Sequence, residues 1–179
     1  MIFLSIFIAL IMVTSILGYI FRDSSQTSVK YNGQQFTYTN NGWRTNLDGL
    51  TYYFSYHPSD IEYLNLSGEV NLANLMEIDI TYDAEADDKE AMGAAAFELS
   101  EILSQKNIYL RQGFTSNNSF DAPIITCSDA TAFVPVIYLV ESNETTGKIV
   151  NNCIIIESQD KNAYTAYIDL IAYKILGII

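Results

Sequence analysis

The segment that decides the fold is residues 77–114, EIDITYDAEADDKEAMGAAAFELSEILSQKNIYLRQGF. Its first residues alternate in polarity and predict a strand over 77–82. Residues 108–114 predict a second strand. Between them, residues 87–106 predict a helix with one apolar stripe, formed by Met92, Ala95, Ala96, Leu99, Ile102 and Leu103. Strand, helix and strand of this length predict a βαβ unit, in which the two strands run parallel.

Three turn dipeptides precede this segment: Asn32-Gly33, Asn41-Gly42 and Asp48-Gly49. Such pairs tolerate the positive φ angles of a type I′ turn, so with the segments 34–39, 43–47 and 50–57 they predict an antiparallel meander. Aromatic residues recur along it at period two and predict the buried face of a sheet, with a sugar-binding platform or a protein interface as alternatives. These aromatic residues are Phe36, Tyr38, Trp43, Tyr52, Phe54 and Tyr56.

The remaining elements complete a mixed α+β or α/β fold. Pro58 ends the last meander strand, and Ser59 with Glu62 forms a capping-box pattern that predicts a short helix. Further helical turns are predicted at 70–75, and further strands at 124–127, 134–140 and 153–157. A final helix is predicted to start at Gln159-Asp160, to end at Gly177 and to pack on the sheet.

Residues 1–21 contain no charged side chain. A helix of 21 residues spans roughly 31 Å, the thickness of a bilayer's hydrocarbon core, so this segment predicts an uncleaved transmembrane anchor. A cleaved signal peptide and a buried core helix are the alternatives, although no basic residue precedes the apolar run. The predicted organisation is an anchor over 1–22, a polar linker over 23–28 and a single ectodomain over 29–179.

The composition limits the partners. Nine Lys and Arg residues against 21 Asp and Glu residues give the 179-residue chain a net charge of −12. Nucleic acids and anionic bilayer surfaces need a basic footprint, so neither is an expected partner. The expected partners are the lipid bilayer, through residues 1–21, and other envelope proteins.

Cys127 and Cys153 are the only cysteines, and both lie at ends of predicted strands. We expect a disulfide between them, with buried free thiols and a reactive thiol or metal ligands as alternatives, because no base or further ligand lies nearby in the sequence. A disulfide favours a domain outside the cell. Arg22 and Lys30, by the positive-inside rule, favour the opposite orientation.

His57, Ser59 and Asp60 form the one polar constellation that suggests catalysis. No Gly-x-Ser-x-Gly elbow accompanies them, so we expect a hydrogen-bonded structural histidine at a strand–helix corner and assign no catalytic residue. No cofactor is expected. Asn65, Asn117 and Asn143 each start an Asn-x-Ser/Thr glycosylation acceptor.

An acidic run between the predicted strand and helix suggests a cation site as its second interpretation. Its spacing does not fit an EF-hand loop, since Asp88 occupies the position of the invariant glycine. We therefore expect a solvated loop and no metal site, with a weak Ca²⁺ site shared with other loops as the alternative. The run comprises Asp79, Asp83, Glu85, Asp87, Asp88 and Glu90.

Six segments stand out by their sequence: PIITCSDAT at 123–131, VPVI at 134–137, ESNET at 141–145, NCIIIE at 152–157, LGI at 176–178 and YHPSD at 56–60. They resemble segments of small membrane-anchored proteins of archaea with reduced genomes. The resemblance implies an anchored ectodomain with paired cysteines, and it carries no catalytic residue.

The leading functional hypothesis is a membrane-anchored, envelope-associated interaction or structural domain without enzymatic activity. One alternative is an envelope hydrolase that uses His57 and nearby carboxylates. Another is a pilin-like filament subunit, although no basic-Gly processing site precedes the apolar segment.

Overall fold

The computed structural model describes residues 7, 11–14 and 27–179. Most of the predicted anchor at 1–22 and most of the linker at 23–28 lie outside these residues. Among the helices of the described residues, none has both the length and the apolar character needed to cross a membrane.

The predicted meander is present as a four-stranded antiparallel sheet. Its strands are β1 (Ser28–Tyr31), β2 (Gln34–Thr39), β3 (Gly42–Leu47) and β4 (Leu50–Phe54). Asn32 and Asp48 have φ angles of 47° and 53°, and the glycine after each has 82°, as a type I′ turn requires. Strand β1 was not predicted; it pairs with β2 from Ser28↔Thr37 to Tyr31↔Gln34.

The elements after the meander are α2 (Pro58–Ile61), β5 (Leu66–Ser67), β6 (Glu77–Tyr82), α3 (Lys89–Gln105), β7 (Tyr109–Phe114), a 3₁₀ turn (Cys127–Asp129), β8 (Val136–Glu141), β9 (Thr146–Val150), β10 (Cys153–Ser158) and α4 (Lys161–Leu176).

The second sheet has six strands in the order β5-β9-β10-β8-β6-β7. The predicted βαβ unit is confirmed, because β6 and β7 pair in parallel and α3 connects them. A hairpin of β9 and β10 turns at Asn151 and Asn152, which have φ angles of 50° and 66°.

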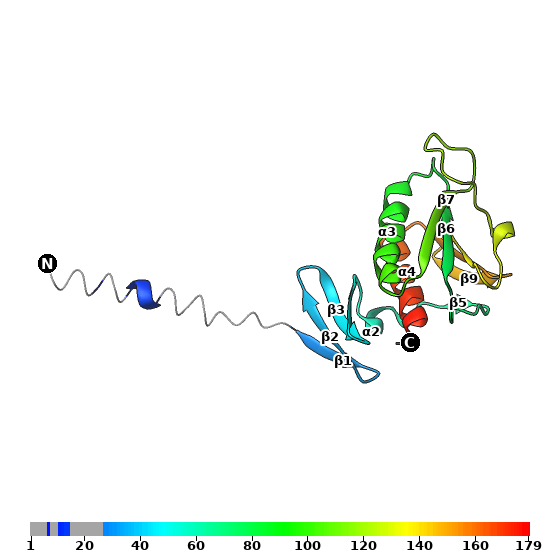
Figure 1. Ribbon diagram of the computed structural model, residues 1–179. Helices are drawn as coiled ribbons and strands as arrows, with labels where there is room; N and C mark the ends of the chain where they lie inside the picture. Colours follow the sequence, from blue (N-terminus) through cyan, green and yellow to red (C-terminus); the bar gives the residue numbers. More distant parts are fainter. Residues whose placement is uncertain (1–6, 8–10, 15–26) are drawn as a thin grey trace.

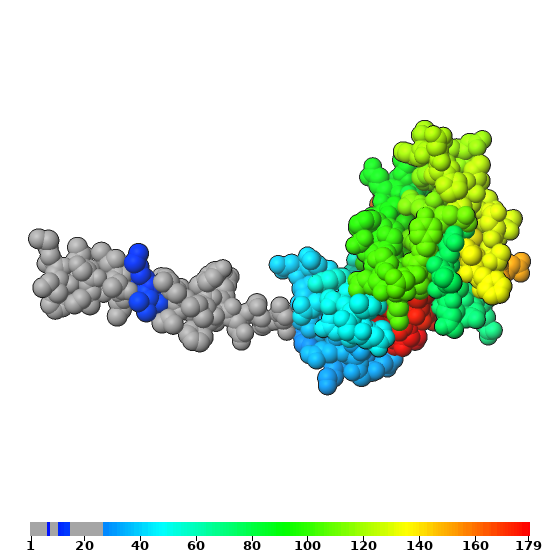
Figure 2. Space-filling view, viewed as in Figure 1, coloured from blue at the N-terminus to red at the C-terminus, as the bar shows by residue number. Residues whose placement is uncertain are grey.

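Helices α3 and α4 lie side by side and cover one face of the six-stranded sheet (Figure 1). The meander forms a lobe against the end of α4, blue to cyan beside red in Figure 2. Tyr173 of α4 joins the two parts, because its ring lies 4.2 Å from that of Phe54 and 6.0 Å from that of Phe36. Buried side chains of both sheets and both long helices therefore form one continuous core.

The aromatic face of the meander is only partly buried. Phe36, Tyr52 and Phe54 are enclosed as predicted, whereas Trp43 is half-buried and Tyr38 is 54% exposed. Tyr38 and Trp43 pack edge to face at 5.2 Å near the turn that joins β2 and β3. The core thus covers this face near α4 and leaves the turn end open.

The ends of α4 lie where the sequence predicts them. Asp160 caps the first turn by accepting the N–H of Asn162 at 3.0 Å, and Gly177 ends the helix in the left-handed conformation at φ 70°. The N-cap of α2 differs from the prediction: it is His57, not Ser59. Pro58 takes the first helical position, because it lacks an N–H and its φ suits that position.

Two segments do not form the predicted elements. Residues 124–127 form no strand: Ile124 makes one isolated bridge to Phe114, and a capping box of Thr126 and Asp129 turns the chain into the 3₁₀ turn. Residues 70–75 form no helix, because Asn74 adopts a φ of 56°, which a helix cannot continue through.

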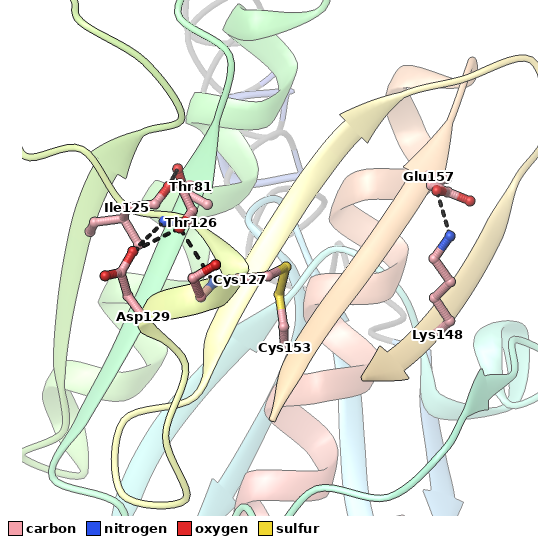
Figure 3. The surroundings of a disulfide bond; sticks show 9 residues. Thr81, Ile125, Thr126, Cys127, Asp129, Lys148, Cys153 and Glu157 are labelled. Atoms are coloured by element: carbon pink, nitrogen blue, oxygen red, sulfur yellow. Dashed lines mark hydrogen bonds and ion pairs between the residues drawn. A yellow bond between two sulfur atoms is a disulfide. The ribbon is translucent and has the colours of Figure 1, made fainter. Parts of the chain in front are cut away.

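The segment that follows β7 crosses the other face of the six-stranded sheet. The hydroxyl of Thr81 in β6 donates to the carbonyl of Ile125 at 2.8 Å, and the predicted disulfide joins Cys127 to Cys153 in β10 (Figure 3). Cys153 is completely buried in a small cluster with Ile125 and Val136. The disulfide therefore fastens a segment without regular strand pairing to the central strands.

Candidate functional site

His57 lies at the corner between β4 and α2 and is only 3% exposed. Its Nδ1 accepts the backbone N–H of Ser59 at 3.3 Å and lies 2.7 Å from the Ser59 hydroxyl. The imidazole packs against Phe36 at 5.1 Å and Trp43 at 4.6 Å between ring centres. Burial lowers the pKa of His57, so the ring is neutral at pH 7.

The other imidazole nitrogen, Nε2, is buried and has no hydrogen-bond partner among the described residues. The three residues of the predicted polar constellation therefore do not form one site. His57 points into the aromatic packing, the Ser59 hydroxyl turns back to His57, and Asp60 faces an open groove. This corner caps a helix and presents no imidazole nitrogen to solvent.

The groove beside this corner has a volume of about 790 Å³, which is in the range of small-molecule sites. Four segments enclose it: the end of the meander, α2 with the chain that follows it, the start of β9, and the first two turns of α4. The residues that give the groove its chemistry are Tyr56, Asp60, Tyr63, Asn65, Asp160 and Tyr167.

Gly147 at the start of β9 allows the groove wall to close. A Cβ atom at this position would lie 2.6 Å from the Tyr167 ring and 2.7 Å from the Leu66 side chain. Only a glycine lets α4 and the chain after α2 approach β9 this closely. The glycine therefore holds Tyr167 in the wall of the groove.

Three tyrosines supply the aromatic surface of the groove. Tyr63 is 77% exposed at the rim, Tyr56 is half-buried, and Tyr167 is buried. Burial raises the pKa of Tyr56, and the negative charge of Asp160 raises it further. Burial and the proximity of Tyr63 raise the pKa of Tyr167. The phenols of Tyr56 and Tyr167 are therefore neutral at pH 7, and the charge of Asp160 reaches Tyr56.

The charge of the groove comes from Asp60 and Asp160. No Lys or Arg is among its lining residues, and no ion pair in the described part of the chain includes either aspartate. One oxygen of Asp160 accepts the Asn162 N–H at the helix cap. The groove therefore presents two carboxylates without a compensating positive charge.

A second carboxyl pair lies behind the same strand end, where Asp169 is enclosed and Glu98 is half-buried. Asp169 of α4 is completely buried and accepts the N–H of Tyr56 at 2.8 Å, while Glu98 of α3 accepts the N–H of Ser55 at 3.1 Å. The hydroxyl of Tyr173 donates to the Tyr56 carbonyl at 2.7 Å. Burial, and next the charge of Glu98, raise the pKa of Asp169 well above its usual range. Side chains of both helices thus fix the end of the meander.

The acidic run is not the uniformly solvated loop that we predicted. Asp79 is completely buried and receives two hydrogen bonds, at 2.6 and 2.8 Å, from the Arg111 guanidinium. Asp88 is 7% exposed and lies 3.1 Å from the Lys161 ammonium. Alternation along β6 turns Asp79 away from α3 and toward its ion-pair partner on β7. Among the described residues, no group of three or more potential ligands could hold a metal ion.

All three glycosylation acceptors are exposed, Asn65 at the groove, Asn117 in the loop after β7 and Asn143 in the loop after β8. Of the residues that give the groove its chemistry, the sequence indicates Tyr56, Asp60 and Asn65, each for a different reason. It indicates Asp160 only as the start of a helix. Tyr63 and Tyr167 carry no sequence signal of their own.

Comparison with models of protein families, with curated proteins and with solved structures finds no match for this chain. The chemistry of the groove must therefore be read from its own residues.

Proposed function

We propose that this chain is a binding protein of the cell envelope that catalyses no reaction, anchored in the membrane by residues 1–21 with residues 29–179 outside. The observation that carries the proposal is the groove lined by Tyr56, which combines aromatic walls with carboxylates that make no ion pair among the described residues. Exposed aromatic and polar groups in a concave surface are typical of ligand sites.

The state of His57 supports binding over hydrolysis. A general base must reach the proton that it abstracts, and His57 is buried with Nδ1 occupied by the Ser59 N–H. Asp60 faces the groove, but no imidazole nitrogen of His57 is accessible beside it. An envelope hydrolase built on His57 would require this corner to open.

The disulfide supports an external location. Disulfides persist in oxidising compartments, and Cys127–Cys153 joins two segments that have no other strand pairing between them. Alkylation of the protein in its native membrane, with and without reductant, tests this part of the proposal. We expect both thiols to react only after reduction; reaction of both without reductant would contradict the external orientation.

Site-specific photo-crosslinking tests the binding function. A benzoylphenylalanine in place of Tyr63, in the full-length chain in its native membranes, is expected to form an adduct with the ligand or partner. Tyr109 is the matched control, because it is 64% exposed at the start of β7 and lies outside the groove. Equal adducts at both positions, or none at Tyr63, would contradict the groove as the binding site.

A further inference from the structure

The charge of the groove selects the class of ligand. Asp60 and Asp160 come from different elements and face one groove without a Lys or Arg among the lining residues. The chain as a whole carries a net charge of −12. Phosphates, carboxylates and nucleic acids would be repelled, so an anionic ligand does not fit this site.

A neutral ligand fits the groove less well than a cation. A sugar would hydrogen-bond to the two carboxylates through its hydroxyl groups, but it would supply no positive charge to balance theirs. An ammonium group donates charge-assisted hydrogen bonds and also supplies that positive charge. Asp160 retains an oxygen for such a bond, because the helix cap uses only Oδ1.

The aromatic walls favour the same ligand. Tyrosine rings attract cations through their negative faces, and three such rings line the groove at Tyr56, Tyr63 and Tyr167. The alkyl part of an alkylammonium group can pack on these rings while its charged end reaches a carboxylate. A primary amine on a flexible chain satisfies both features of the groove at once.

We infer that the groove binds an alkylammonium group, either of a free polyamine or of a lysine side chain on a partner protein. This inference rests on the proposed function, since it names the ligand class of the same site. The carboxylates of Asp60 and Asp160 hold the ammonium group, and the tyrosines hold the alkyl chain.

Calorimetric titration of the full-length protein in detergent micelles tests the inference. The probes are spermidine, a lysine-containing peptide, maltose and inorganic phosphate. We expect spermidine and the peptide to bind, and the Asp60→Asn, Asp160→Asn double variant to weaken both by about tenfold or more. Asparagine remains a good N-cap at position 160, so α4 is preserved.

A matched control separates the groove from general charge attraction. Asp121→Asn with Glu101→Gln removes the same number of charges from exposed positions outside the groove. We expect it to leave the affinity unchanged within about twofold. An equal loss in the control variant would overturn the inference, because binding would then follow net charge.

The remaining outcomes are distinct. Tighter binding of the peptide than of spermidine identifies a partner protein as the source of the amine, and the reverse order identifies a free polyamine. Binding of maltose alone would overturn the ligand class and leave the proposed binding function standing. Failure of every probe, together with no adduct at Tyr63, would overturn both.

Discussion

Two acidic sites meet at Tyr56, one closed and one open. Behind the strand end, Asp169 and Glu98 accept the backbone N–H groups of Tyr56 and Ser55. In front of it, Asp60 and Asp160 face a groove, and only one of their oxygens has a hydrogen-bond partner among the described residues. Carboxyl groups around Tyr56 therefore have two different roles: one pair holds the backbone, and the other faces solvent in the groove.

The difference lies in burial and in the donors that each carboxyl group meets. A buried carboxyl group needs hydrogen bonds, and the end of the meander supplies one to Oδ2 of Asp169, whereas Oδ1 has no partner among the described residues. A carboxylate at an open groove is stabilised by water, which a ligand can replace. Removing a closed carboxyl should therefore change stability, and removing an open one should change binding.

The largest effect on stability is expected from the disulfide, which belongs to neither acidic site. Replacing Cys127 and Cys153 with serine should lower the free energy of unfolding by about 3.5 kcal/mol, because the loop is no longer closed in the unfolded chain. Amine binding at the groove should persist below the lowered melting temperature, since none of the groove's lining residues belongs to the disulfide cluster. Loss of amine binding in the folded double variant would show that the disulfide and the groove are coupled.

Removal of the closed carboxyl is expected to have the next largest effect. Asp169→Ala leaves the buried N–H of Tyr56 without an acceptor and should cost about 2–3 kcal/mol of stability. Asp60→Ala at the groove should cost less than about 0.5 kcal/mol, as exposed positions usually do. Chemical denaturation of both variants measures the contrast. Equal losses would remove the distinction between the two sites.

The pH dependence of stability sharpens the same contrast. The raised pKa of Asp169 means that the folded chain holds a proton that the unfolded chain has lost. The free energy of unfolding should therefore decrease as the pH rises from the ordinary aspartate pKa to the raised folded pKa, by about 1.4 kcal/mol for each unit between them. Asp169→Asn keeps an acceptor for Tyr56 and cannot ionise. Melting curves of this variant should lose the decrease; an unchanged decrease would assign it to other groups.

The smallest effect is expected at the rim of the groove. Tyr63→Ala should weaken amine binding by about two- to fivefold, the size of an exposed cation–π contact, and should leave stability nearly unchanged. Tyr109→Ala, at an exposed tyrosine outside the groove, is the control and should change neither. Identical affinities of the two variants would exclude Tyr63 from the site.

The sequence predicts those parts of the fold that local signals specify. The turns at Asn32-Gly33 and Asp48-Gly49 and the βαβ unit follow from dipeptide and periodicity patterns, and both are present. Strand β9 was missed, because Gly147 and Lys148 interrupt any alternation and β10 supplies its pairing. The segment 124–127 is apolar because it packs across the sheet face through Ile125. Its sequence therefore resembles that of a strand, although its burial comes from tertiary packing.

The groove was only partly predictable for the same reason. The sequence indicates Asp60 as a candidate polar residue because it lies close to His57. It indicates Asp160 only as a helix cap and Tyr167 only as part of an apolar helix. Their convergence depends on the chain after α2, β9 and α4 meeting at Gly147, which no local pattern encodes. Asp169 did carry a signal, an acidic residue between Ile168 and Leu170 in an otherwise apolar helix.

The central claim is that the open site binds a ligand while the closed site holds the fold. Its most direct test is an NMR titration of the isotopically labelled full-length chain with spermidine. Backbone amide shifts are predicted at 60–65, 145–147 and 160–163, and not in the acidic segment at 83–90. Shifts confined to 83–90, or spread evenly over the acidic surface, would contradict the account.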